Sequence, residues 1–197
     1  VHPRVFNRLV TDISKRRISN NLVDRDDPWD GPVIVKTDRN CGAEPEEVLC
    51  GPAVWVRRVW RGVLRRLGPG GTPRSRPSWR SVTTMKSRDY PVFPSLGEVP
   101  PEVFRNDALV VERFLPEMLD GDYCLRYYYC CGRAEANVLL RSRDPVIKGT
   151  NASSIEEAPI PPGVREIRQR LGMDYGKLDY VLHDGWPVLL DVNRTPA

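Results

Sequence analysis

Two short apolar stretches near the end of the chain, 178–182 and 188–193, flank the residues His183-Asp184-Gly185-Trp186. An Asp-Gly pair between two such stretches is a strong signal for a β-hairpin. Side chains on a strand repeat every two residues, so Asp191 and Asn193 share one face. This predicted hairpin constrains the fold most, because it places polar oxygens on an otherwise apolar sheet.

The position of Asp179 on the hairpin depends on the length of the turn. An even-numbered turn pairs Asp179 with Leu190 and puts the carboxylates of Asp179 and Asp191 on opposite faces. A three-residue turn over 183–185 pairs Asp179 with Leu189 instead and makes Asp191 its diagonal neighbour. The sequence leaves both registers open.

The side chains of Asp179, Asp191 and Asn193 predict a metal site. Two carboxylates and an amide oxygen on one sheet face are costly without a cation, and Mg²⁺ prefers such oxygen ligands. A solvated sheet face is the simpler explanation of any single Asp-x-Asn. The neighbouring stretch 188–190 is apolar, however, which indicates a half-buried sheet and favours Mg²⁺, with Mn²⁺ as an alternative ion.

Three lysines lie beside apolar residues, where a strongly hydrated ammonium group needs a partner. They are Lys36 after a β-branched run, Lys148 after Val146-Ile147, and Lys177 two residues before Asp179. A surface lysine with a buried stem would explain any one of them. Together with the metal face, the three lysines indicate a polyphosphate ligand.

The rest of the chain predicts an α+β fold with antiparallel sheets. Elements of both kinds alternate without an internal repeat. The predicted strands are 32–36, 108–114 and a hairpin of 123–130 with 134–141, and the predicted helices begin near Glu44 and cover 53–67 and 162–170.

Composition excludes several classes of protein. With 197 residues, 40% of them hydrophobic and 28% charged, the chain can bury a core as one domain or two small lobes and is neither fibrous nor fully disordered. No apolar run reaches the roughly 20 residues that cross a bilayer, and no signal peptide opens the chain. Five cysteines without a CxxC pair, and only two histidines, make a zinc site unexpected and favour a reducing cytoplasm.

The positive charge of the chain is concentrated in one segment. Residues 57–88 hold ten basic residues and no acidic one, interleaved with tryptophans. Such a stretch can bind nucleic acid or an anionic membrane. An amphipathic helix followed by a solvated loop explains the same pattern more simply, and we favour that interpretation.

These motifs resemble those of the ATP-grasp ligases, a family that includes D-alanine–D-alanine ligase. The resemblance runs from about Lys15 to the C-terminus and rests on Val33-Ile34-Val35-Lys36, on Val110 to Leu115, on Asp179, and on Asp191-x-Asn193-x-Thr195-Pro196. It implies two α+β lobes that hold ATP between them. The lid lobe would cover 31–107 with a basic insertion at 52–90, the metal-binding lobe would cover 108–197, and 1–30 would end a preceding domain. On this interpretation the chain is a fragment that lacks most of the family's N-terminal domain.

The resemblance also implies a role for each candidate residue. Lys36 would contact the nucleotide phosphates, Lys15 would be the earlier lysine of the pattern, and Lys148 and Lys177 would face phosphate. The hinge would contact the adenine, Asp122 or alternatively Glu117 would bind the ribose, and Asp179, Asp191 and Asn193 would hold Mg²⁺. The hinge residues are Glu112, Arg113, Phe114 and Leu115.

The activity that the resemblance implies is an ATP-dependent carboxylate–amine ligase acting through an acyl phosphate. Its partners would be ATP and small-molecule carboxylate and amine substrates. A kinase that phosphorylates a hydroxyl would use the same metal and lysines, and a non-catalytic binding module using 57–88 is a further alternative. The sequence departs from the family after Lys36, where the loop 37–42 has a single glycine instead of a glycine-rich stretch. Arg39 could replace part of that phosphate contact.

Overall fold

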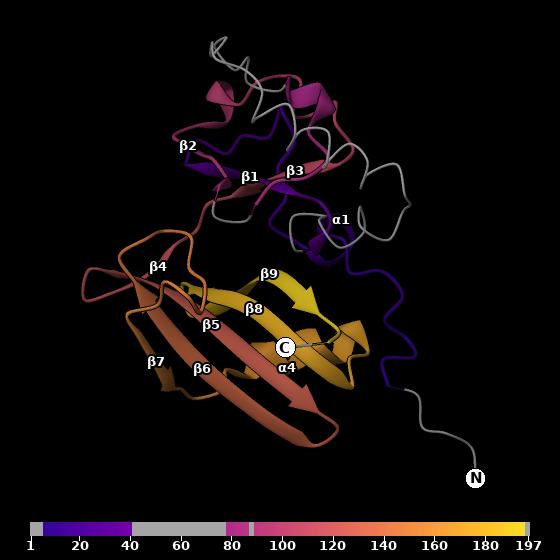
Figure 1. Ribbon diagram of the computed structural model, residues 1–197, viewed down its shortest axis with the longest axis vertical. Helices are drawn as coiled ribbons and strands as arrows, with labels where there is room; N and C mark the ends of the chain where they lie inside the picture. Colours follow the sequence, from indigo (N-terminus) through magenta and orange to yellow (C-terminus); the bar gives the residue numbers. More distant parts are fainter. Residues whose placement is uncertain (1–5, 41–77, 87–88, 196–197) are drawn as a thin grey trace, which may run out of the picture.

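The chain folds into two antiparallel sheets in the computed structural model, which describes residues 6–40, 78–86 and 89–195 (Figure 1). The smaller sheet has the strand order β2-β1-β3, and the larger has the order β7-β6-β5-β8-β9 with β4 paired to β5. The expected α+β class with antiparallel sheets is confirmed. The elements are α1 (Lys15–Ile18), β1 (Val33–Thr37), β2 (Val92–Phe93), β3 (Leu109–Arg113), β4 (Glu117–Leu119), β5 (Asp122–Cys131), β6 (Ala134–Ser142), β7 (Ser154–Glu157), α4 (Pro162–Leu171), β8 (Tyr175–His183) and β9 (Trp186–Asn193), with short 3₁₀ turns at Trp79–Ser81 and Leu96–Glu98.

The smaller sheet buries one face in its own core. Val33 and Val35 of β1 point to the same side as Val111 of β3, where they pack against the segment that carries Leu96. Because side chains alternate along a strand, Lys36 points to the opposite side, toward the larger sheet. The apolar pattern that predicted this strand therefore also sets the direction of its lysine.

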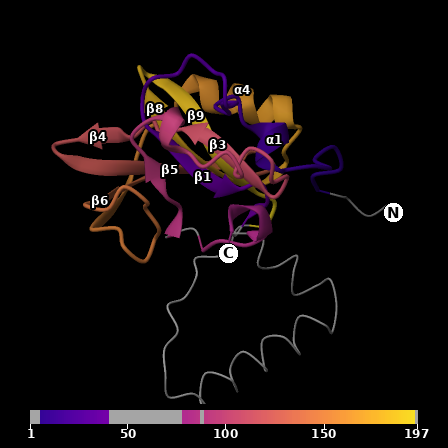
Figure 2. The ribbon, with the colours of Figure 1, turned by 90° about the horizontal axis from the view of Figure 1, so that it is seen from above.

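The larger sheet has a core on each face. Its rear face packs Tyr128 and Leu178 against Val164 of α4 and Val10 of the N-terminal segment. Its front face carries Leu125 and Val181 and is partly covered by the loop between β6 and β7. The remaining part of the front face lies beneath the smaller sheet (Figures 1 and 2).

Two segments of the chain connect the sheets. One is the short linker 114–116 between β3 and β4. The other is the N-terminal segment: Asn7 binds the backbone of Tyr175 at the start of β8, whereas Asn21 binds the backbone of Arg113 on β3. Between these anchors lies α1, beside β9. The N-terminal segment therefore contacts the larger sheet before α1 and the smaller sheet after it.

Most elements expected from the sequence are present. The strand near 32–36, the strand within 108–114, both hairpins and the helix at 162–170 are confirmed. The structure adds α1, β2, β4 and β7, which the sequence did not predict. The helices expected from Glu44 and over 53–67, and most of the basic segment 57–88, lie outside the described residues. None of the helices in the described part of the chain is long and apolar enough to cross a bilayer.

Candidate nucleotide and metal site

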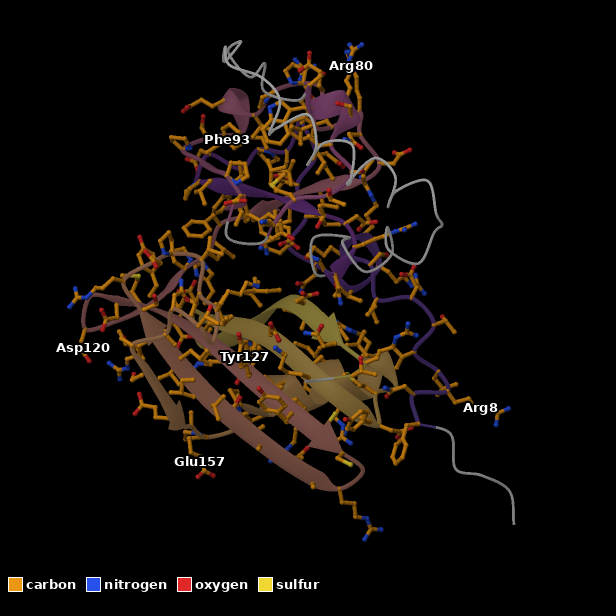
Figure 3. All side chains as sticks on the ribbon, viewed as in Figure 1. Arg8, Arg80, Phe93, Asp120, Tyr127 and Glu157 are labelled. Carbon is orange, nitrogen blue, oxygen red and sulfur yellow. The ribbon has the colours of Figure 1, made fainter. Side chains whose placement is uncertain are left out.

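A cleft of about 400 Å³ lies between the two sheets. The linker between the sheets lines the apolar end of the cleft. Strands β8 and β9 line the charged end. Figure 3 shows the side chains around it, with Tyr127 of β5 at the centre of the larger sheet and Asp120 and Glu157 at its outer edge. Of the predicted site residues, those that line the cleft are Lys15, Lys36, Arg113, Phe114, Leu115, Lys148, Lys177, Asp179, Asp191 and Asn193.

A β-bulge brings the two candidate metal-binding carboxylates together. The β8–β9 turn has two residues, Asp184 and Gly185, both with positive φ, and it pairs His183 with Trp186. An even turn alone would have put Asp179 opposite Leu190. Between Asp179 and Tyr180 the register shifts, so that Asp179 pairs directly with Asp191. The three-residue turn considered from the sequence is therefore wrong. The even-numbered turn is present, but the register shift places Asp179 opposite Asp191 and not opposite Leu190.

The bulge explains why both carboxylates face the cleft. An extra residue in one strand lets two consecutive side chains lie on the same side of the sheet. Leu190 and Asp191 both line the cleft. Two residues further along β9, Asn193 lies opposite Lys177 of β8. The four polar side chains therefore form two cross-strand pairs on one surface.

Asp179 lies in a strongly desolvated environment. It is 8% exposed, and burial raises its pKa to about 6, with the charge of Asp191 acting in the same direction. The ammonium group of Lys177, 3.0 Å from Asp179 Oδ1, and the charge of Lys148 oppose this increase. A carboxylate that remains costly to ionise despite these cations would be stabilised by a further positive charge.

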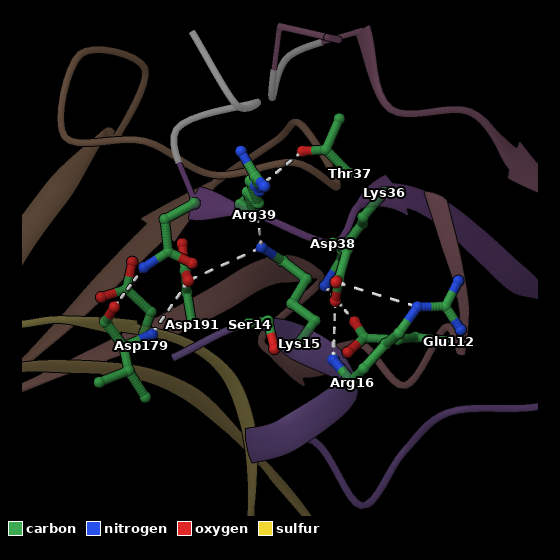
Figure 4. A network of polar contacts seen from close by, with 12 residues as sticks. Ser14, Lys15, Arg16, Lys36, Thr37, Asp38, Arg39, Glu112, Asp179 and Asp191 are labelled. Carbon is green, nitrogen blue, oxygen red and sulfur yellow. Dashed lines mark hydrogen bonds and ion pairs between the residues drawn. The ribbon is translucent and has the colours of Figure 1, made fainter. Parts of the chain in front are cut away.

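Asp191 is held by the N-terminal segment. Lys15 Nζ lies 3.7 Å from Asp191 Oδ1 and 3.4 Å from the carbonyl oxygen of Arg39, and Lys15 is only 2% exposed (Figure 4). Nearby, Asn40 Nδ2 donates to the carbonyl of Val192. These contacts join α1 and the loop after β1 to β9. Among the described residues, the ammonium group of Lys15 makes only these two long contacts, which leave it able to bind an additional anion.

Lys36 and Glu112 form a buried pair behind the cleft. Lys36 Nζ lies 2.6 Å from Glu112 Oε2, and Glu112 is completely buried (Figure 4). Glu112 Oε1 has no hydrogen-bond partner among the described residues. Unlike Lys36, Glu112 does not line the cleft.

Lys148 projects from a loop that Asn151 stabilises. Asn151 Oδ1 accepts the backbone N–H of Lys148 at 2.7 Å, and Asn151 Nδ2 donates to the carbonyl of Val146 at 3.0 Å. Burial lowers the pKa of Lys148, although the charges of Asp179 and Asp191 oppose this effect. Its ammonium group makes no hydrogen bond or ion pair within the described ranges and is available to a ligand.

The two residues considered for the ribose, Asp122 and Glu117, flank residues that line the cleft but do not line it themselves. Asp122 Oδ1 contacts Arg143 Nε at 2.8 Å. Glu117 accepts two hydrogen bonds of 3.0 Å from Arg126 Nε and one of 2.8 Å from the N–H of Leu182. The carboxylate of Glu117 is therefore committed to the fold, and neither residue lines the cleft. A direct contact of either carboxylate with a ribose therefore stays a prediction.

The charges around the cleft favour an anionic ligand. The cationic lining residues are Lys15, Lys36, Arg113, Lys148 and Lys177, whereas the anionic ones are Asp179 and Asp191. Within the described residues no group of three or more His, Cys, Asp or Glu gathers to hold a metal. The candidate set of two carboxylates and an amide still fits Mg²⁺, which keeps positions for phosphate and water.

The sequence did not single out Tyr127 or Asn151. Tyr127 lines the cleft opposite Asp179, but the β5–β8 pairing that places it there joins distant segments. Asn151 lies in the loop between β6 and β7. Its position in a short loop with Gly149 was a usable signal, because Asn side chains commonly bind nearby backbone groups in turns.

Comparisons with known proteins give matches in structure alone. No protein-family model matches the chain, and no curated protein matches it. The chain is similar to a crystal structure of D-alanine–D-alanine ligase from Bacillus anthracis, with 13% identity and a TM-score of 0.38 over 84% of this chain and 44% of that one. A structure of the same ligase complexed with ATP matches with 15% identity and a TM-score of 0.33 over 53% of this chain and 38% of that one. The chain spans less than half the length of either structure.

Proposed function

We propose that this chain binds ATP and Mg²⁺ in the cleft between its two sheets and is part of an ATP-dependent carboxylate–amine ligase. The observation that carries the proposal is the cross-strand pair of Asp179 and Asp191 in a cleft that four lysines also line. The pair supplies oxygen ligands for a divalent cation, and the lysines supply positive charge for phosphates. The ATP-grasp motifs in the sequence support the same conclusion.

The apolar end of the cleft suits the adenine ring. The linker that walls it contains Phe114 and Leu115, and the backbone amide and carbonyl of Leu115 have no partner within the described residues. Backbone groups exposed in this way can pair with the edge of a base. The unpaired oxygen of Glu112 could accept the adenine amino group once Lys36 turns toward the phosphates.

The charged end suits the triphosphate. Asp179, Asp191 and Asn193 would hold Mg²⁺, which when bound neutralises charge on the phosphate oxygens. Lys36, Lys148 and Lys177 would neutralise further negative charge on the phosphates. Such preorganised cations stabilise a transition state in which negative charge moves from the γ-phosphate to the leaving group.

The proposed reaction needs positioning rather than a protein nucleophile. An oxygen of the substrate carboxylate attacks the γ-phosphorus, and the bond between that phosphorus and the β–γ bridging oxygen breaks. ADP departs, and the product is an acyl phosphate. An amine then attacks the acyl carbon, the bond to the phosphate oxygen breaks, and the nitrogen loses a proton as inorganic phosphate departs. The chain's lysines act by holding the reacting groups and neutralising their charge.

A test of this function measures ADP and phosphate release across pairs of carboxylates and amines, together with detection of the amide. Asp191→Ala is expected to reduce turnover at least 100-fold, because it removes half of the carboxylate pair. Asp184→Asn, in the exposed β8–β9 turn, is the control, because asparagine tolerates the left-handed backbone conformation of this position. Full turnover by Asp191→Ala would refute the proposal. ADP accumulating with a phosphorylated hydroxyl and no amide would show a kinase in the same cleft.

A further inference from the structure

Tyr127 lies directly beneath the charged end of the cleft. On β5 it pairs with Asp179 of β8, and its neighbour on the same face, Tyr129, pairs with Lys177. Tyr127 packs against the front-face core that contains Leu125 and Val181. Its backbone position is therefore fixed from two sides, by the sheet and by the core.

The ring of Tyr127 holds the ammonium group of Lys177. Lys177 Nζ lies 3.8 Å from the ring centroid and 3.0 Å from Asp179 Oδ1. An ammonium group over an aromatic face is attracted by the ring's electron density, and more strongly where water is excluded. Tyr129 packs edge-on against the ring of Tyr127, with centroids 6.2 Å apart, and so limits its rotation.

The hydroxyl of Tyr127 contributes little to this arrangement. It makes no hydrogen bond within the part of the chain that the structure describes. Burial raises the pKa of Tyr127, and the charge of Asp179 raises it further, so the hydroxyl stays neutral. The useful part of the side chain is therefore the aromatic face.

We propose that Tyr127 is a positioning residue that supports Lys177 from below and directs its ammonium group toward a phosphate bound over Asp179. When a cation binds Asp179, Lys177 loses its ion pair with Asp179 but keeps its contact with the ring of Tyr127. The ring then holds the ammonium group at the floor of the cleft instead of letting it extend into solvent. This inference rests on the proposed function. It goes beyond that function by assigning a role to a residue that binds neither the metal nor the phosphates.

The test compares Tyr127→Phe, which keeps the ring, with Tyr127→Leu, which removes it. In the wild type and in Tyr127→Phe, ring current should shift the ε-methylene protons of Lys177 upfield in a ¹H–¹³C spectrum, and Tyr127→Leu should abolish the shift. Tyr127→Leu should weaken Mg·ATP binding about tenfold, which corresponds to about 1.4 kcal/mol and lies within the range for such contacts. Tyr127→Phe should bind Mg·ATP like the wild type.

Adenosine, which has no phosphates, separates positioning from damage to the fold. Its affinity should be the same in all three proteins. An equal loss of adenosine and Mg·ATP binding in Tyr127→Leu would overturn the inference, as would unchanged Mg·ATP affinity or the absence of an upfield shift in the wild type. If the wild type binds no ATP at all, the proposed function fails instead, which is a distinguishable result.

Discussion

At the scale of single residues, the site is defined by a carboxylate in an unfavourable place. Burial raises the pKa of Asp179 to about 6 even with Lys177 beside it. Proteins rarely retain such a group for stability, because an apolar residue would cost less. Shifted pKa values of this kind cluster at functional sites. The environment of Asp179 is therefore best explained by a positively charged ligand that binds its carboxylate.

The cost of ionising Asp179 predicts a specific dependence of stability on pH. Because the folded-state pKa is raised, the stabilisation from this group is present at low pH and is lost as the pH rises through about 6. In EDTA, the free energy of unfolding of the wild type minus that of Asp179→Asn should therefore increase by about 2 kcal/mol between pH 7.5 and 4.5. Urea titrations at the two pH values measure this difference.

The control for that comparison is Asp184→Asn. Asp184 is highly exposed, and asparagine tolerates its left-handed backbone conformation. The corresponding difference for Asp184→Asn should change by less than the difference for Asp179→Asn over the same range. A difference for Asp179→Asn that is flat, or that decreases toward low pH, would contradict the raised pKa.

At the scale of elements, the β8–β9 hairpin depends on close contact between its strands. Gly176, at the start of β8, has a φ of 146°, which L side chains rarely adopt. A Cβ added there would collide with the side chain of Met173 and with the backbone carbonyl of Asn193. The glycine lets β8 approach the residue that the proposal assigns to the metal. Hairpin geometry and site geometry are therefore linked at this position.

Replacing Gly176 should disturb both the β8–β9 hairpin and the proposed metal site. Gly176→Ala is expected to lower the free energy of unfolding by more than about 2 kcal/mol, from backbone strain and the collision together, and to weaken Mn²⁺ binding. Gly185→Ala is the matched control, because Gly185 also has positive φ but no atom within 4 Å of the added Cβ. It should cost about 1 kcal/mol and leave Mn²⁺ affinity unchanged. Equal effects of the two substitutions would show that the contact with Asn193 is unimportant.

At the scale of the whole molecule, the cleft exists because two sheets are held at a fixed separation. The linker 114–116 joins them on one side, and the N-terminal segment joins them on the other. Lys15 lies within that second connection, with its Nζ 3.7 Å from Asp191 Oδ1. A ligand that binds Asp191 would therefore compete with this contact between the N-terminal segment and β9.

The sequence predicted the parts of this arrangement that have local causes. The Asp-Gly turn, the β-branched run before Lys36 and the helix at 162–170 follow from turn chemistry and periodicity. The bulge at Leu190 could not be predicted, because no residue there has an obvious local preference for it. The contact of Tyr127 with Lys177 was equally inaccessible, because it depends on pairing between strands far apart in the sequence. Long-range register is decided by packing, which a single sequence does not display.

The proposed function requires that Asp179 and Asp191 bind a divalent cation together with the phosphates of ATP. Calorimetric titration of ATP into the protein, with Mg²⁺ and with EDTA, tests it most directly. We expect ATP to bind at least tenfold more tightly with Mg²⁺, and we expect Asp191→Asn with Mg²⁺ to bind no better than the wild type in EDTA. Equal affinity of the wild type in Mg²⁺ and EDTA, or no binding of ATP in either, would contradict the claim.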